Sequence, residues 1–92
     1  MKAYLGDVVI TKRHSFIGKI YKKDHFFEDS QEWFDQQVPP LPKKAKRETW
    51  YHLLCNGAGS IYIPESDILQ ILSKKESAKF SNPWESFHFG TK

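Results

Sequence analysis

The chain has 92 residues, 39% of them hydrophobic and 27% charged, which is typical of a folded globular domain and too apolar for a wholly disordered one. This length provides for one hydrophobic core and excludes two independent ones. Fourteen Lys and Arg against eleven Asp and Glu leave a formal charge of +3, which permits a polyanionic partner without requiring one.

Cysteine usage and hydropathy indicate the compartment. The single Cys55 excludes an intramolecular disulfide and is expected to be a small buried hydrophobic residue in a reducing environment. No run approaches the roughly 18 apolar residues that span a bilayer. Asp7 stands where a signal peptide would continue its apolar stretch. We therefore expect a cytoplasmic protein.

Two strands are predicted in the first quarter of the chain. Gly6 and Asp7 indicate a turn, and the β-branched residues 8–11 that follow favour a strand. After a short connection, a second apolar run over residues 16–21 predicts an antiparallel partner. Gly18 within this run indicates a bulge or a sharp bend.

Residues 25–47 differ in character and predict a long, partly mobile loop. Its acidic stretch, residues 28–35, is expected to form one or two helical turns capped by Asp29 or Ser30. The prolines in residues 38–42 are incompatible with a helix or a central strand, so polyproline-like extension is expected. Residues 43–47 form a basic pentapeptide with one interruption.

The second half of the chain predicts three more strands. Residues 49–55 and 60–63 form a hairpin across Asn56-Gly57, a pair that accepts positive φ. Pro64 is expected to end the ladder, residues 65–67 to form a 3₁₀-like turn, and residues 68–72 a last strand. This order predicts an all-β, SH3-like barrel of about five strands over residues 1–73.

Residues 74–92 are expected to form a basic and aromatic C-terminal arm. A disordered tail rarely keeps a Trp and two Phe. The arm is therefore expected either to dock on its own barrel or to bind a partner.

Several motifs together resemble the YccV-like family, also called HspQ or the hemimethylated-DNA-binding domain. They are residues 6–9 and 12–21, Asp24, residues 32–33 in the long loop, and residues 50–54 and 62–68. Family members carry G-x-x-V-x-H-x-x-x-x-G-V-I-x-x-x-D, a loop with a Trp, and the strands W/F-Y-H/N-V-L-V and Y-V-A-E-E-N-L. In the last motif, Pro64 and residues 66–67 replace the usual Ala and Glu-Asn.

The resemblance implies a non-enzymatic binding module. Bacterial members are described as binding hemimethylated DNA and as modulating AAA+ proteolysis under heat stress, and the domain also occurs in eukaryotic F-box proteins as an adaptor-type module. The sequence has no nucleophile motif, phosphate-binding glycine loop or paired-carboxylate signature. The scattered histidines have no zinc-ligand spacing with Cys55, so neither a metal nor another cofactor is predicted.

Candidate DNA contacts are the basic residues of the first hairpin and of the long loop. If strand pairing brings both groups to one side, they could contact several phosphates of duplex DNA. The alternative is that these side chains only solvate exposed faces and protect strand edges, with the acidic residues nearby cancelling much of their field. The candidates are Lys12, Arg13, Lys19, Lys22, Lys23, Lys43, Lys44, Lys46 and Arg47.

Candidate contacts to a protein partner are the aromatic residues of the loop and of the arm, because exposed aromatics flanked by charges make good anchors. The alternative is that they fold back and cover an open end of the barrel. The candidates are Trp33, Phe34, Trp84, Phe87 and Phe89. An adaptor that acts on a protease or its substrate is slightly favoured over a DNA-binding protein, because the net charge is modest. A self-associating structural subunit, a small homo-oligomer, is the third alternative.

Overall fold

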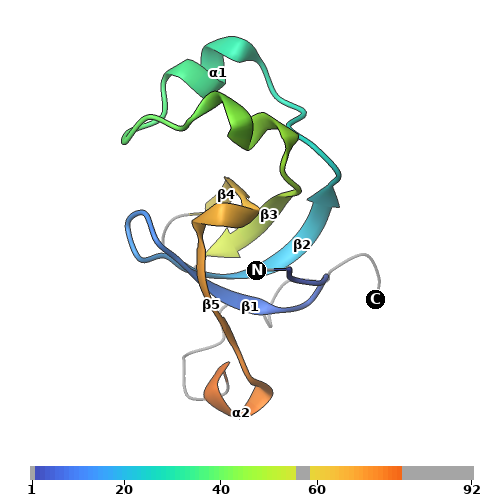
Figure 1. Cartoon of the computed structure of the whole chain (residues 1–92). Coiled ribbons are helices and arrows are strands. Elements are labelled where there is room, and N and C mark those ends of the chain that lie inside the picture. Colours follow the sequence, from blue (N-terminus) through green and yellow to red (C-terminus); the bar gives the residue numbers. More distant parts are fainter. Residues whose placement is uncertain (1, 56–58, 78–92) are drawn as a thin grey trace.

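The computed structural model describes residues 2–55 and 59–77 and shows one antiparallel sheet of five strands in the order β4-β3-β2-β1-β5. The all-β class is confirmed, and the observed strands lie within a few residues of the predicted ones (Figure 1). Their bounds are β1 Val8–Thr11, β2 Ile17–Asp24, β3 Trp50–Cys55, β4 Gly59–Pro64 and β5 Ile68–Leu72.

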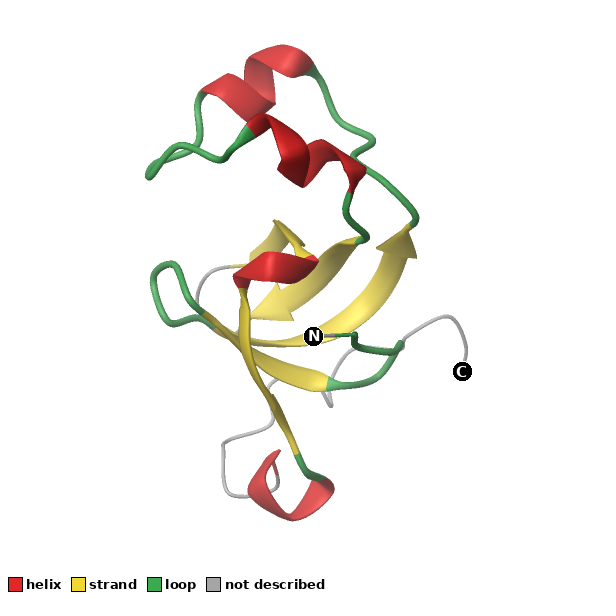
Figure 2. Ribbon diagram, viewed as in Figure 1, coloured by secondary structure: helices red, strands yellow, loops and turns green. Residues whose placement is uncertain are grey.

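The connection between the last two strands shows that the sheet is curved. β4 and β5 lie at opposite edges of the sheet, yet only the 3₁₀ helix η2, Glu65–Asp67, separates them in the chain. Four residue steps reach about 14 Å at most, whereas the edges of a flat five-stranded sheet are about 19 Å apart. The sheet therefore curls until its edges approach each other, giving a small, partly open barrel (Figure 2).

The concave face of the sheet holds the main core. Tyr51 and Leu53 of β3 are fully buried there, together with Ala3, Val9, Ile20, Ile63 and Ile68. The Tyr51 hydroxyl accepts a hydrogen bond from Ala3 N at 3.2 Å and donates one to Glu65 Oε1 at 3.2 Å. Cys55 is buried in this cluster, as expected, and its burial raises the pKa of the thiol to about 11.

Gly18 serves close packing, and the prediction of a bulge at this residue is wrong. A Cβ atom at Gly18 would lie 2.5 Å from Cys55 Sγ and 3.0 Å from Leu53 Cβ. Only glycine lets β2 approach β3 this closely. The register irregularity lies further along, between Ile20 and Lys22.

The connection between β2 and β3, predicted as a long loop, is a folded layer that packs on the sheet. It contains α1, Gln31–Asp35, and a 3₁₀ helix η1, Lys43–Arg47, which the basic pentapeptide forms. Ser30 caps α1 by accepting from Trp33 N at 3.0 Å, which confirms one of the two predicted caps.

This folded layer, which we call the helical layer, has its own apolar cluster around Trp50. Phe34, Ala45 and Trp50 are buried in it, with Phe27, Trp33, Leu41 and Tyr62 packed against them. Trp50 Nε1 donates to Ala45 O at 2.8 Å and thereby ties η1 to the sheet. Trp50 and Tyr51 point to opposite faces of β3 and are both buried, so both faces of this strand are covered.

The last described element is a short helix, α2, Lys74–Ser77, which follows β5 and lies at the opposite end of the molecule from α1 and η1 (Figure 1). No helix in residues 2–55 and 59–77 has the length and apolar character needed to cross a membrane.

Candidate binding groove

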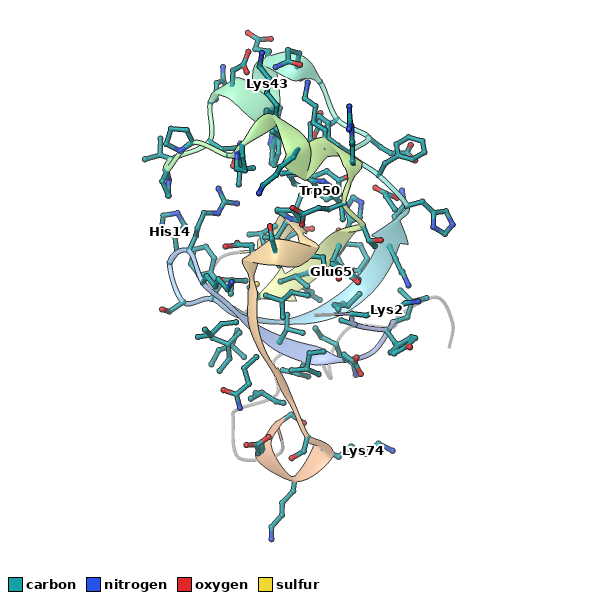
Figure 3. All side chains as sticks on the ribbon, viewed as in Figure 1. Lys2, His14, Lys43, Trp50, Glu65 and Lys74 are labelled. Carbon is teal, nitrogen blue, oxygen red and sulfur yellow. The ribbon has the colours of Figure 1, made fainter. Side chains whose placement is uncertain are left out.

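A hollow of about 360 Å³ lies where three segments meet: the turn between β1 and β2, the α1 region, and strand β4. We call this hollow the β4 groove. Figure 3 shows His14 at the tip of the β1–β2 turn, and Trp50 between the sheet and the helical layer. Sequence-distant segments therefore form this groove, and its chemistry follows from what each contributes.

The β1–β2 turn forms one rim and has an unusual backbone. His14 and Ser15 both lie in the left-handed region, with φ of 63° and 52°. The Thr11 hydroxyl stabilises the turn, because it donates to Arg13 O at 2.6 Å and accepts from Phe16 N at 3.0 Å. Residues other than glycine rarely adopt a positive φ, and residues with such a strained backbone are concentrated at functional sites.

A buried ion pair lines the β4 groove beside η2. Asp67 of η2 is 6% exposed and accepts from Arg13 Nε at 3.2 Å and from Arg13 N at 3.1 Å. The carboxylate and the guanidinium neutralise each other. Arg13 is therefore engaged within the protein and holds the β1–β2 turn against η2.

The helical layer forms the opposite wall. Asp29, Trp33 and Gln37 line the groove from the α1 region. His14 Nε2 lies 3.2 Å from Val38 O, a contact in which the imidazole donates, so the β1–β2 turn and the proline-containing segment meet above the groove. This contact ties the wall to the β1–β2 turn.

The side of the groove formed by β3 and β4 carries a polar network centred on Asp24. His52 Nε2 lies 2.9 Å from Asp24 Oδ2, and the Tyr62 hydroxyl donates to the same oxygen at 2.8 Å. Because a carboxylate only accepts, His52 is the donor. The Tyr62 hydroxyl also accepts from Glu28 N at 3.0 Å, and its ring stacks against His52 with 4.3 Å between centroids.

These contacts shift two pKa values in opposite directions. Burial alone would raise the pKa of Asp24, but the hydrogen bonds from His52 and Tyr62 and the nearby charges of His52 and Lys22 lower it overall. Burial, followed by the hydrogen bond to Asp24, raises the pKa of Tyr62 well above its usual value. Asp24 therefore stays ionised and Tyr62 stays a neutral donor at physiological pH.

We expect Tyr62→Phe to lower the free energy of unfolding by about 1 kcal/mol at pH 7, because it removes a hydrogen bond to a carboxylate. A lowered pKa for Asp24 means that the ionised carboxylate stabilises the fold above its ordinary pKa of 3.8 and that this stabilisation is lost as the pH falls through the folded-state value. The difference in free energy of unfolding between the wild type and Tyr62→Phe, measured by urea unfolding, should therefore be smaller at about pH 2.5 than at pH 7.

Tyr21→Phe is the matched control for that measurement. Tyr21 also hydrogen-bonds through its hydroxyl, but to Ser60 Oγ and not to Asp24. The loss of unfolding free energy caused by Tyr21→Phe should be the same at both pH values. A Tyr62→Phe deficit that is equally independent of pH would contradict the role assigned to Asp24.

The predicted basic residues lie on three separate segments. Lys12 and Arg13 lie on the β1–β2 turn, Lys19, Lys22 and Lys23 on β2, and the remaining four on η1. Figure 3 shows Lys43 within the helical layer, away from the sheet. Of the nine residues, only Arg13 lines the β4 groove.

The predicted aromatic residues divide into three kinds. Trp33 is half-buried, packs against the cluster around Trp50 and also lines the groove. Phe34 is 4% exposed and belongs to the cluster around Trp50, which matches the alternative that it covers the barrel. Trp84, Phe87 and Phe89 lie outside the described residues.

Sequence reasoning missed His14, Asp29, His52 and Tyr62 as lining residues of a single groove. They come from four different segments, so no local spacing connects them. One local signal was available for His52. Successive side chains of a strand point to opposite faces, so a core Tyr51 places His52 on the other face of β3.

The curled five-stranded sheet, its covering layer and the β4 groove define a small all-β domain with a preformed surface hollow. The chain belongs to the YccV-like family, whose model, described as "Hemimethylated DNA-binding protein YccV like", matches residues 1–91. That match also includes the basic pentapeptide and most of the C-terminal arm. No curated protein and no solved structure shows significant similarity to the chain.

Proposed function

We propose that this chain is a non-enzymatic recognition module that binds a protein partner at the β4 groove and acts as an adaptor in protein quality control, where AAA+ proteases work. The observation that carries the proposal is the composition of the groove. Its walls present aromatic rings from Phe16, Trp33 and Tyr62, whereas its one basic side chain, Arg13, is already paired with Asp67. Preformed hollows with aromatic walls are typical of sites that anchor side chains of a partner.

The engagement of other cations within the protein supports the same proposal. Lys46 Nζ lies 4.9 Å from the centre of the Phe34 ring and also bonds to Gln31. Lys23 Nζ lies 5.5 Å from the centre of the Tyr4 ring. Cations that stabilise their own fold contribute less to an attractive field for a polyanion. The single reduced Cys55 agrees with a cytoplasmic site of action.

A degradation assay tests the adaptor proposal. A model substrate is incubated with a bacterial AAA+ protease, with and without the full chain, and the initial rate of cleavage is measured. We expect a dose-dependent change in rate that Trp33→Ala reduces, with folding of the variant checked by circular dichroism. An unchanged rate with several proteases of this class would count against the proposal.

Duplex DNA is the second candidate partner, and the family description favours it. Five of the nine predicted basic residues are exposed, namely Lys12, Lys22, Lys43, Lys44 and Arg47. Against them stand four exposed acidic residues on the β2–β3 connection, Glu28, Asp29, Glu32 and Asp35, which offset part of the positive field.

A mobility-shift titration against unmethylated, hemimethylated and fully methylated duplexes, each at two salt concentrations, tests the DNA candidate. Phosphate contacts predict binding that weakens steeply with salt, and recognition of methylation predicts different affinities for the three duplexes. Absence of a shift at low salt would exclude this candidate.

A further inference from the structure

Strand β4 has one unpaired edge among the described residues. It is the terminal strand of the sheet, with β3 on one side only. Glu65 N donates to Thr49 O at 2.9 Å, in line with the β3–β4 register. Because hydrogen-bonded pairs alternate along an antiparallel ladder, Ile63 and Ile61 also bond to β3. The main-chain N–H and C=O groups of Ser60 and Tyr62 therefore point away from the sheet.

The pairing of β1 with β2, followed across to β3, independently shows which residues of β4 bond to β3. Ile20 N donates to Asp7 O at 2.9 Å, so Ile20 turns its main chain toward β1 and its neighbour Lys19 turns toward β3. Lys19 lies opposite Leu54, which leaves Leu53 to bond to β4. Both routes assign the odd-numbered residues of β4 to the ladder and the even-numbered ones to the free edge.

The β4 groove runs along this free edge. Four consecutive residues of β4, residues 60–63, line it. Successive side chains of a strand point to opposite faces, so a hollow over one face would touch only alternate residues. A hollow that touches all four must lie beside the strand, where the unpaired groups of Ser60 and Tyr62 open into it. No described side chain bonds to those main-chain groups.

We propose that the free edge of β4 pairs with an extended segment of a partner protein and that the β4 groove receives a basic side chain of that segment. The inference rests on the proposed function, of which it specifies the mode of recognition. Strand addition at an open sheet edge obtains affinity from main-chain hydrogen bonds and specificity from pockets for alternate side chains.

The charge of the groove selects a basic side chain. Arg13 and Asp67 neutralise each other, whereas Asp29 Oδ1 accepts only from Ser30 N, at 2.7 Å, and has no cationic partner among the described residues. Asp29 is thus the one carboxylate of the lining, among the described residues, that no Lys or Arg compensates. A carboxylate beside aromatic faces holds an ammonium or guanidinium group by ion pairing and cation–π attraction.

The same charge argues against a second copy of the chain as the occupant of the edge. Pairing β4 with β4 of another copy would bring together two grooves that each carry the uncompensated Asp29 carboxylate. Like charges across an interface oppose association. A basic segment of a different protein meets complementary charge instead.

The test uses the ¹⁵N-labelled full chain and a synthetic peptide probe, acetyl-Ser-Thr-Val-Lys-Val-Thr-Ser-amide, followed by NMR. We expect the amide resonances of Ser60 and Tyr62 to shift and to gain protection from hydrogen exchange as the probe is added. Replacing the probe lysine with norleucine should weaken binding about tenfold, because it removes the cation and keeps the chain length. Asp29→Asn should weaken binding of the lysine probe and leave that of the norleucine probe unchanged.

A matched pair of variants isolates the main-chain contact. Ser60→Ala and Ser60→Pro both remove the hydroxyl that bonds to Tyr21, but only proline also removes the outward N–H. Proline suits an edge strand in this orientation, and the preceding Gly59 tolerates it. We expect Ser60→Pro to weaken probe binding about fivefold relative to Ser60→Ala. N-methylation of the probe amides that face β4 tests the same bonds without changing the protein.

The outcomes separate this inference from the adaptor proposal. If the chain alters proteolysis but the probe shifts no β4 amide, or Ser60→Pro and Ser60→Ala bind alike, edge pairing is wrong while the adaptor role stands. If Ser60 and Tyr62 shift with protein concentration alone, a second copy occupies the edge and the inference is overturned. Shifts of the same amides by duplex DNA, with none by the probe, would overturn it as well.

Discussion

Replacing Trp50 with alanine is expected to lower the free energy of unfolding by about 3–5 kcal/mol, the usual range for truncating a buried aromatic side chain. The Trp50 side chain is fully buried, and its ring centre lies 4.8 Å from that of Tyr62 and 4.9 Å from that of Phe27. Small domains have a total stability of about 5–15 kcal/mol. The loss is therefore a large part of the total, and urea unfolding at pH 7 should show a clearly lower midpoint.

The same substitution should loosen the helical layer before the sheet. Phe34 and Ala45 reach the sheet largely through Trp50, whereas the core on the concave face does not contain it. Hydrogen exchange at the α1 and η1 amides should accelerate more than at β1 and β2 amides. Uniform acceleration in all elements would show that the two clusters unfold as one unit.

Trp50→Phe is the control for packing. Phenylalanine keeps most of the buried area and removes the bond from Nε1 to Ala45 O. That carbonyl still accepts from Glu48 N at 3.1 Å, so it does not become unsatisfied. We expect a loss of about 1–2 kcal/mol. A loss as large as that of Trp50→Ala would mean that the hydrogen bond, and not the ring packing, holds the layer.

The second large effect is expected for Asp67→Ala, at about 2–3 kcal/mol, since removing one partner of a buried ion pair leaves the other charge uncompensated. Arg13 is 14% exposed, so water offsets part of this cost. The substitution also leaves Arg13 N without its acceptor at 3.1 Å and should loosen the turn that forms the rim of the β4 groove. Urea unfolding measures the loss of stability.

Asp67→Asn separates the charge from the hydrogen bonds. An amide oxygen can still accept from Arg13 N, but the negative charge is gone, so we expect an intermediate loss of about 1–2 kcal/mol. Equal losses for both variants would show that the charge alone stabilises the turn. Adding 0.5 M NaCl should change the wild-type stability little, since buried pairs are weakly screened.

Asp67 also contributes indirectly to the proposed site. Its pairing with Arg13 leaves Asp29 to set the net charge of the β4 groove. Loss of Asp67 would leave the Arg13 guanidinium uncompensated beside the groove, where its positive charge offsets that of Asp29. The basic probe peptide should then bind more weakly, although neither Arg13 nor Asp67 is proposed to contact it.

Local patterns in the sequence predicted most of the sheet. Alternating and β-branched runs located all five strands within a few residues, and residues 65–67 were correctly predicted as a 3₁₀ turn. These features depend on residues that are neighbours in the chain. Ser30 was a predicted cap because its hydroxyl serves a helix that begins one residue later.

Predictions failed where contacts between distant segments decide the structure. A bulge was one of the two features predicted at Gly18, but the register is regular there and the side chain of Cys55, across the ladder, is what requires glycine. Residues 43–47 looked like an exposed basic loop, yet the bond from Trp50 to Ala45 O and the burial of Ala45 hold them as a 3₁₀ helix. Neither partner is visible from local composition.

The sequence by itself determined the class of the fold and the order of the strands along the chain, because hydrophobic periodicity and turn chemistry act over a few residues. Its motifs indicated the family. The tertiary structure alone decided which cations stay available to a partner and where the groove lies. Arg13 is paired by Asp67, a residue 54 positions away, and the edge of β4 meets a turn and a helix from the first half of the chain. Electrostatics and burial depend on distance in space, which only the folded chain defines.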